Sequence, residues 1–515
     1  MNLSAPNAEI GEFESGCGPT VSTGRANAIG IMMLSDVLVE PAIHQWPAQA
    51  AATPSGEMFG HAQSLWREKT RLELGLATDR PIIATGHQTL LWHPGILAKY
   101  LAVDLAAAQS GCATANLVVD QHVGSFASLD VPIRLRRGGL RSRTIELAPV
   151  RDDVPMGLHE SFEPRINVKS LPFAHPSVEA GMMRIVDAVQ SNRNSPNAAL
   201  QMAGALAALM SRWVAPMPNV TASALGETSL ARALMQHMMD DPHAMAHAYN
   251  EAVRAFPDAG IPPLLVRDDY VEVPLWRLRP DGRRMRAYDN DLHGVLDTES
   301  SGLARSAHVM PDAAEHHTTA GQAKETGTVP ILLPRALFMT ALVRLGMCDL
   351  FVHGTGGAIY DRAMERWIRN WLGVKVAPVA VVTATVRLPL EVISAEINVD
   401  SAWKNLRRVQ HDPDASGDEA PSAMKRTWLK RIEREPRRSA ERRQAFFDMH
   451  RDLAARREEA SSRVDKAREA YDRARCARDD AAIAERRDWP FPLYPDAMID
   501  DLRDTIARIG AVWTI

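Results

Sequence analysis

Residues 81–100 read PIIATGHQTLLWHPGILAKY, and this stretch decides the fold. The apolar run 82–84 breaks at Thr85-Gly86, which is typical of a buried strand that ends in a turn. A helix then opens at His93-Pro94-Gly95 and runs to Gln109, because proline suits the first helical position, where its missing N–H is not needed. Strand, polar turn and helix start form the corner of an α/β domain where free N–H groups favour a phosphate or carboxylate.

Polar groups crowd this corner and the end of the next strand. A second apolar run, 115–119, ends at Asp120-Gln121-His122. Strand, helix and strand within about forty residues predict a βαβ unit whose two strands are parallel neighbours. We therefore expect His87 and His122 to lie near one crevice, at the sheet edge where open α/β sheets bind ligands. The polar residues around the first corner are His87, Gln88, His93 and Lys99.

A second unit of the same kind follows within residues 331–383. Pro334-Arg335 precedes a predicted helix over 336–345, and a short apolar strand over 349–352 comes next. A helix over 358–371 follows, with Asp361 in its first turn, where a carboxylate complements the helix dipole. The turn between this strand and this helix reads His353-Gly354-Thr355-Gly356-Gly357.

Three histidines thus follow strand ends, namely His87, His122 and His353. Imidazole can bind an anion or act as an acid or base near neutral pH, so we predict that these side chains converge on one crevice as catalytic groups. A metal site made by the three histidines and Asp120 is a second interpretation, although the ligand spacing matches no motif. A third is that each histidine only caps a helix or bonds to backbone.

The remaining chain suggests four parts in an α/β protein. At 515 residues it is too long for one core. Alternation over 131–147 predicts a hairpin with its turn at 137–139, and 176–256 is mostly helical. An unbroken helix over 439–487 has an apolar seam that predicts a coiled-coil arm, paired with a preceding helix or another subunit. The parts are a lead-in (1–60), an α/β core with a helical insertion (61–396), the arm (397–488) and a closing segment (489–515).

The composition argues against nucleic-acid-binding, membrane-spanning and secreted proteins. The hydrophobic fraction is 46%, the charged fraction is 24% and the formal net charge is −4, so no global positive field predicts nucleic-acid binding. No apolar run approaches the ~18 residues that span a membrane, and the first residues do not resemble a secretory signal. Four cysteines far apart in the sequence are typical of reduced thiols, so we expect a cytoplasmic protein.

The order of these motifs resembles the BshC family, the cysteine-adding ligases of bacillithiol biosynthesis. The resemblance covers residues 80–400 and the coiled-coil arm, and it includes the run Asp258-Ala259-Gly260-Ile261-Pro262-Pro263. It implies a Rossmann-like core, a crevice for a sugar-malate acceptor, and an arm that supports a homodimer. The implied reaction joins the carboxyl group of cysteine to the amine of glucosaminyl-malate, a small polar anionic substrate.

The resemblance also implies a set of substrate-binding residues. The Gly-Gln-Gln turn of the family corresponds to Gly86-His87-Gln88, and its Gly-Pro-Gly-Glu turn to residues 354–357. The chain departs from the family pattern at three places: His87 replaces a glutamine, His93-Pro94-Gly95 replaces the Thr/Gly-Pro before the helix, and Gly357 replaces the glutamate. We therefore expect a BshC-like architecture with a different or broadened acceptor. The residues carried over are Gly86, Gln88, Lys99, Asp120, His122, Arg335, Gly354, Gly356, Gly357 and Tyr360, and we add His93 and Asp361 from the same crevice.

Three hypotheses of function follow. The first is a ligase that forms a C–N bond between an amino acid and a small polar amine, using ATP with Mg²⁺ or an activated carboxyl group. The second is a nucleotide-dependent transferase that uses the same histidines against phosphates. The third is a non-catalytic assembly protein in which the coiled-coil arm is the working part.

Overall fold

Strand β4, Ile82–His87, lies near the middle of a six-stranded sheet. The computed structural model describes residues 37–52, 54–136, 139–296, 330–391, 398–415 and 421–510. The strand order is β1-β13-β12-β4-β5-β8, and every neighbouring pair is parallel except β1 with β13. The expected α/β class with a mostly parallel sheet is confirmed. The other strands are β1 Val37–Glu40, β5 Ala113–Val118, β8 Asn219–Thr221, β12 Leu350–His353 and β13 Val379–Ala384.

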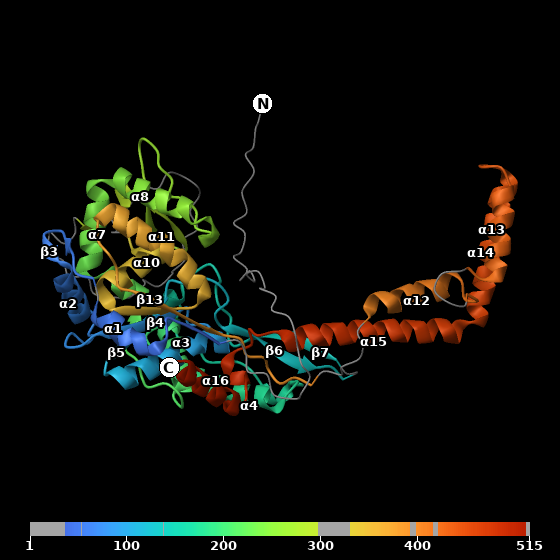
Figure 1. The fold of residues 1–515 in the computed structure, drawn as a ribbon, viewed down its shortest axis with the longest axis horizontal. Helices are drawn as coiled ribbons and strands as arrows, with labels where there is room; N and C mark the ends of the chain where they lie inside the picture. Colours follow the sequence, from blue (N-terminus) through green and yellow to red (C-terminus); the bar gives the residue numbers. More distant parts are fainter. Residues whose placement is uncertain are drawn as a thin grey trace, which may run out of the picture. The chain divides into compact units, whose positions relative to one another are not determined.

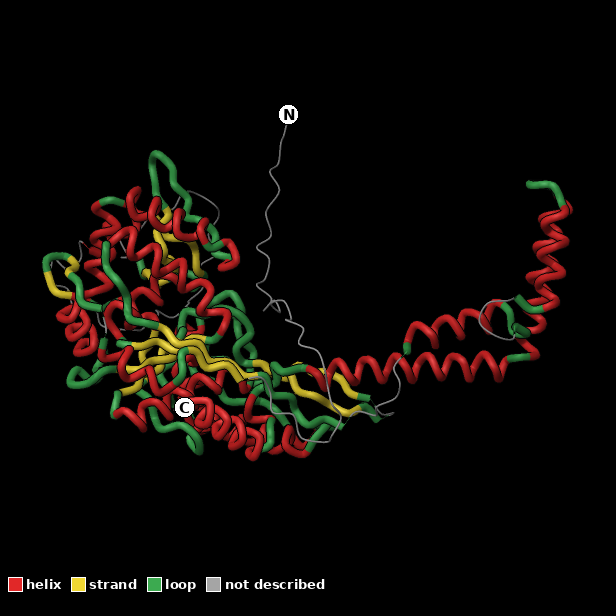
Figure 2. Tube along the Cα trace, viewed as in Figure 1, coloured by secondary structure: helices red, strands yellow, loops and turns green. Residues whose placement is uncertain are grey.

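Helices cover both faces of this sheet (Figures 1 and 2). Side chains alternate along a strand, so Ile83 packs in one core while Ile82 and Ala84 pack in the other. We call the two sides the α3 face and the α11 face. The α3 face carries α1 Trp46–Ala51, α3 Pro94–Ser110, α4 Pro176–Ser191, α5 Ala198–Met210 and α16 Asp496–Gly510. The α11 face carries α7 Ser229–Asp240, α8 Pro242–Ala255, α10 Ala336–Leu342 and α11 Thr355–Leu372.

The strand at the first corner is longer than predicted. β4 continues through Thr85 and Gly86 to His87, because these residues pair with Asn116, Leu117 and Val118 of β5. A Cβ atom at Gly86 would lie 2.5 Å from Leu117 Cβ, so only glycine allows this approach of the two strands. The predicted helix is confirmed, since α3 begins at Pro94.

The second glycine turn is largely helical. α11 begins at Thr355, so Gly356 and Gly357 lie in its first turn and not in a loop before residue 358. Gly354 is its N-cap residue. The preceding helix also changes form, because α10 passes at Leu342 into a π-helical turn, η6, Val343–Met347. Strand β12 follows where the sequence placed it.

The prediction that residues 176–256 are mostly a helical insertion is wrong in one respect. This segment contains β8, a strand of the central sheet, which was missed because it has only 3 residues. The remaining short helices are α2 Gln63–Glu73, α6 Ala222–Gly226 and α9 Asp289–Leu296. Small sheets are formed by β2 Glu57–Met58 with β3 His61–Ala62, by the predicted hairpin β6 Ser128–Arg134 and β7 Leu140–Glu146, and by β9 Glu272–Leu278, β10 Arg284–Tyr288 and β11 Leu332–Pro334.

The predicted unbroken helix over 439–487 is two helices. α14, Ala440–Glu459, ends before Ala460, and α15 spans Ser461–Glu485. Two earlier helices, α12 Val399–His411 and α13 Ala423–Arg434, pack along α15 and α14 respectively. Side chains of the predicted seam are therefore covered from within the chain, including Met449 and Leu453 against α13. Figure 1 shows α12 beside α15.

Several expectations fall outside the described residues. These are the lead-in before residue 37, most of the hairpin turn at 137–139, and Cys17. Among the helices that the structure describes, none is long and apolar enough to cross a membrane.

Candidate functional site

Lys99 is the central residue of the first corner. Helix α3 places it against the end of β4, where its side chain is only 3% exposed. Its Nζ donates a hydrogen bond to the carbonyl oxygen of Gly86 at 2.8 Å, and no carboxylate among the described residues pairs with it. Burial lowers the pKa of Lys99 to about 7, because the charged form is poorly solvated there. An anion at this corner would supply the missing counter-charge.

His87 lies beside Lys99 on the α3 face. Its Nδ1 donates to the carbonyl oxygen of Gln88 at 3.2 Å, which leaves Nε2 as the lone-pair nitrogen. Burial lowers the pKa of His87 to about 3, and Lys99, His93 and His122 add to this effect. The electrostatic coupling shows that these four basic side chains share one neighbourhood. His87 is therefore neutral at pH 7.

His93 caps helix α3. Its Nδ1 accepts a hydrogen bond from the backbone N–H of Gly95 at 3.1 Å, so the side chain satisfies one of the free N–H groups at the start of the helix. Burial lowers the pKa of His93 to about 4, with a further contribution from Arg487. The other nitrogen of the ring makes no hydrogen bond within the described residues. The cap fixes the ring beside the corner.

The C-terminal segment supports this corner from outside. The backbone N–H of Phe491 donates to the carbonyl oxygen of Trp92 at 2.5 Å. The Trp92 indole stacks on Tyr100 with ring centroids 4.5 Å apart, and it donates to the carbonyl oxygen of Gln88 at 2.6 Å. Residues far apart in the sequence thus hold the turn that carries His87.

Asp120 and His122 follow β5 at the same edge. The Asp120 carboxylate accepts hydrogen bonds from the backbone N–H and the hydroxyl group of Ser223, at the start of α6. Burial raises the pKa of Asp120 in spite of these bonds. Burial also lowers the pKa of His122 to about 4, and Arg284 lowers it further. His122 thus lies near both the first corner and a second set of cationic side chains.

This second set lies on and beside the small sheet β10-β9-β11. Arg335 was among the predicted substrate-binding residues, whereas Arg284 was not predicted. Arg284 and Arg335 lie over the Trp276 ring, at 4.8 and 4.7 Å from its centroid. Arg335 pairs with the buried carboxylate of Glu272, whereas Arg284 donates to the carbonyl oxygen of Gln121 at 2.8 Å and has no carboxylate partner in the described chain. Burial lowers the pKa of Arg284 to about 10. Arg284 is therefore the charged group of the crevice at pH 7.

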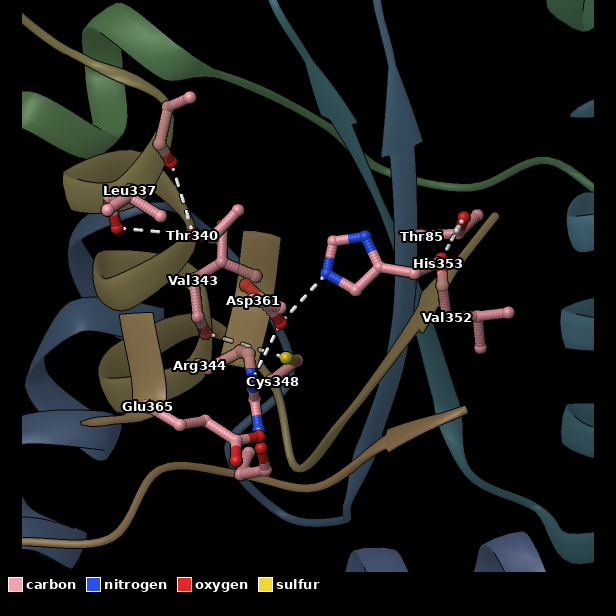
Figure 3. A network of polar contacts seen from close by, with 12 residues as sticks. Thr85, Leu337, Thr340, Val343, Arg344, Cys348, Val352, His353, Asp361 and Glu365 are labelled. Atoms are coloured by element: carbon pink, nitrogen blue, oxygen red, sulfur yellow. Dashed lines mark hydrogen bonds and ion pairs between the residues drawn. The ribbon is translucent and has the colours of Figure 1, made fainter. Parts of the chain in front are cut away.

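His353 belongs to a different environment (Figure 3). Side chains two residues apart on a strand point to the same face of the sheet. His353 therefore shares the α11 face with Phe351, whereas His87 shares the α3 face with Ile83, four residues before it. The His353 Nε2 lies 3.0 Å from Asp361 Oδ2. The three predicted catalytic histidines therefore do not converge: His87 and His122 lie together, and His353 points to the opposite side of the sheet.

A buried ion-pair network holds His353. Arg344, 1% exposed, donates to Asp361 at 2.6 Å and to Glu365 at 2.5 Å. Burial raises the pKa of Asp361, but His353 and Arg344 outweigh it and hold that pKa below its usual range. Each charge in this network has a partner, which is typical of a structural arrangement.

The glycines and the tyrosine of the second turn surround this network. A Cβ atom at Gly357 would collide with the His353 ring, whereas one at Gly356 would meet nothing within 4 Å. The Tyr360 ring lies edge-on to His353 at 6.0 Å, and burial raises its pKa. A glutamate at position 357 would be incompatible with this position of His353.

The described residues include no group of three or more His, Cys, Asp or Glu side chains that could hold a metal ion. The metal interpretation also requires His87 and His353 in one site, and these point to opposite faces. Two hollows, of about 450 and 260 Å³, lie around α11, away from these residues. A buried charge without a partner is the stronger indication of a ligand, so the basic side chains define the candidate site.

We call His87, His93, Lys99, His122 and Arg284, with Asp120 beside them, the crevice group, after the crevice that the sequence predicts at this sheet edge. Neutral imidazoles beside a lysine and an arginine can bind an anion and take up protons from solvent. A scan against models of protein families found no match, and a search of curated proteins found none.

Proposed function

We propose that the crevice group binds a small anionic substrate and that the protein is an enzyme acting on it. The observation that carries this proposal is Lys99, a buried amine at the carboxyl edge of β4 with no carboxylate partner in the described chain. Burying a charge without a partner costs several kcal/mol, so such a residue indicates a ligand that supplies the opposite charge.

The remaining crevice group supports an anion of more than one charge. Arg284 adds a second cation, and His122 lies electrostatically between Arg284 and the first corner. The carboxyl ends of parallel strands are also the usual binding edge of open α/β sheets. A dicarboxylate or a phosphate ester has the required charge.

The reaction that we propose is the formation of a C–N bond, as the BshC resemblance implies. In such a ligase, an amine attacks a carboxyl carbon that ATP has activated, the bond from that carbon to the phosphate or AMP oxygen breaks, and a base accepts the proton that the amine loses. His87 is the candidate for this role, because its hydrogen bond to Gln88 leaves Nε2 as an acceptor. Its pKa of about 3 makes it a weak base in the empty protein, and a bound anion would raise that pKa towards the range in which imidazole is an effective base. A Rossmann-like core, a coiled-coil arm that supports a homodimer, and ATP with Mg²⁺ as the activating cofactor belong to the same proposal.

Ligand binding provides the first test. Thermal unfolding of the full chain should shift upward with malate or a phosphate ester, since a ligand that binds only the folded state raises the midpoint. Lys99→Met, which keeps the volume and removes the charge, should abolish the shift and leave the protein folded. Exposed Arg80→Gln is the matched control and should respond as the wild type does. An equal shift in Lys99→Met would refute the proposed site.

Product formation provides the second test. The protein is incubated with cysteine, an amine-bearing polar acid, and ATP with and without Mg²⁺, and mass spectrometry searches for the condensed product. His87→Ala should remove turnover without changing anion binding by more than a few-fold. Anion binding with no product from any nucleotide would retain the site and reject the ligase.

A further inference from the structure

A hollow of about 450 Å³ lies at the other edge of the central sheet. The segment 374–378, which leads into the amino end of β13, forms one wall, and Gln49 of α1 belongs to another. Crevice residues stand at the carboxyl ends of the strands, so the hollow is a separate place in the fold. Its volume is within the range of small-molecule sites.

Cations outnumber carboxylates in this hollow. Arg344, Arg369 and Lys375 line it, and Glu365 is the carboxylate among its lining residues. Arg344 already binds Glu365 at 2.5 Å, which neutralises that pair. Arg369 and Lys375 are exposed and have no acidic partner among the residues that the structure describes. The excess charge of the hollow is therefore positive.

A buried acceptor adds a second requirement. The Oε1 atom of Gln49 is buried and makes no hydrogen bond within the described structure. A buried acceptor without a donor is costly, so a group that donates a hydrogen bond to it from the hollow would stabilise the protein. An anion without an O–H group, such as sulfate, cannot donate to this amide, whereas a ligand with a hydroxyl group can.

We propose that this hollow is a second ligand site, which takes a small phosphate or carboxylate bearing a hydroxyl group. Arg369 and Lys375 bind the anionic group, and the Gln49 amide turns towards the hollow so that Oε1 accepts from the hydroxyl group. A ligand with both an anionic group and a hydroxyl group would give partners to the two unpaired cations and to the unpaired acceptor that line the hollow. The site is independent of the crevice group and of any reaction there.

Glycerol 3-phosphate is a suitable probe, since it carries a dianion and two hydroxyl groups. Titration calorimetry is carried out on the full-length Lys99→Met variant, in which the crevice has lost its central cation. We expect saturable binding of one equivalent, and an affinity at least tenfold lower in the added double variant Arg369→Gln/Lys375→Gln. Arg362→Gln, on the same helix but outside this hollow, should keep the affinity.

The hydroxyl requirement has its own arm. Gln49→Leu should lower the affinity for glycerol 3-phosphate but not for sulfate, a dianion without an O–H group, which should bind more weakly in both proteins. Circular dichroism of each variant confirms folding before titration. Unchanged binding in Arg369→Gln/Lys375→Gln, or equal binding of glycerol 3-phosphate and sulfate to the Lys99→Met protein, would overturn the proposal.

Discussion

The two faces of the central sheet use basic side chains in opposite ways. On the α3 face, Lys99 lies buried with a single backbone acceptor as its partner. On the α11 face, Arg344 is equally buried but donates to Ala377, Asp361 and Glu365. Burial is thus similar, and pairing differs. A buried charge whose partner is present belongs to the fold, because removing either partner destabilises the protein. A buried charge without a partner instead indicates a place where a ligand of opposite charge could bind.

Breaking the paired side should have the largest effect on stability. Arg344→Met leaves Asp361 buried without its cation, and we expect a loss of about 3–5 kcal/mol in the free energy of unfolding. Urea unfolding at pH 7 measures this loss. Arg362→Met, on the exposed side of α11, should change stability by less than about 0.5 kcal/mol. A small effect of Arg344→Met would mean that the ion pairs of Arg344 do not stabilise the fold.

The unpaired side should instead show a characteristic pH dependence. The pKa of Lys99 is about 7 in the folded protein and ~10.4 in an unfolded chain, so the unfolded state binds more protons between these values. Stability from this residue is present above pH 10 and is lost as the pH falls towards 7, by up to about 4 kcal/mol. Lys99→Met should lack this component. Urea unfolding of both proteins between pH 7 and 10 gives the difference.

Gly357→Ala sharpens the comparison within one helical turn. The added methyl group collides with the His353 ring, and we expect a loss of about 1–3 kcal/mol in unfolding free energy. Gly356→Ala is the matched control, because its methyl group meets nothing within 4 Å and alanine favours the helix by up to about 1 kcal/mol. Equal effects of the two substitutions would show that His353 does not occupy this position.

Proton uptake should accompany anion binding at the crevice. Burial holds the pKa values of His87, His122 and Lys99 low, and a bound anion raises them by favouring the charged forms. Affinity for malate should therefore rise as the pH falls from 8 to 6, by up to about tenfold per proton taken up and per pH unit. Calorimetry in buffers of different ionisation enthalpy counts the protons. Independence from pH would place the anion elsewhere.

The first corner could be predicted because its signals are local. An apolar run and a Pro94 after a capping residue define β4 and α3 without help from the remaining chain. The three-residue strand β8 could not be predicted, since its neighbours in the sheet decide its conformation. The helix break at Ala460 had a signal, because the apolar seam already misses a turn at Arg456-Arg457.

The candidate site was predictable in part for a similar reason. The positions of His87 and His122 follow from parallel strand ends, but side-chain direction depends on strand parity. Counting from Phe351 places His353 on the α11 face, but residues 350–352 are all apolar, so the sequence does not show which face each of them takes. Arg284 and Trp276 had no comparable signal, because only tertiary packing brings their small sheet to the crevice.

The hydrogen bond between Phe491 and Trp92 has a consequence for synthesis in the cell. About 400 residues separate the two partners, and ribosomes add ~5–20 residues per second. Phe491 is therefore synthesised roughly 20–80 s after Trp92, and until then the turn around His87 lacks this hydrogen bond. Nascent chains that stop before residue 489 would expose Trp92 and Tyr100 to chaperones. The support of the corner is therefore complete only after residue 491 has been synthesised.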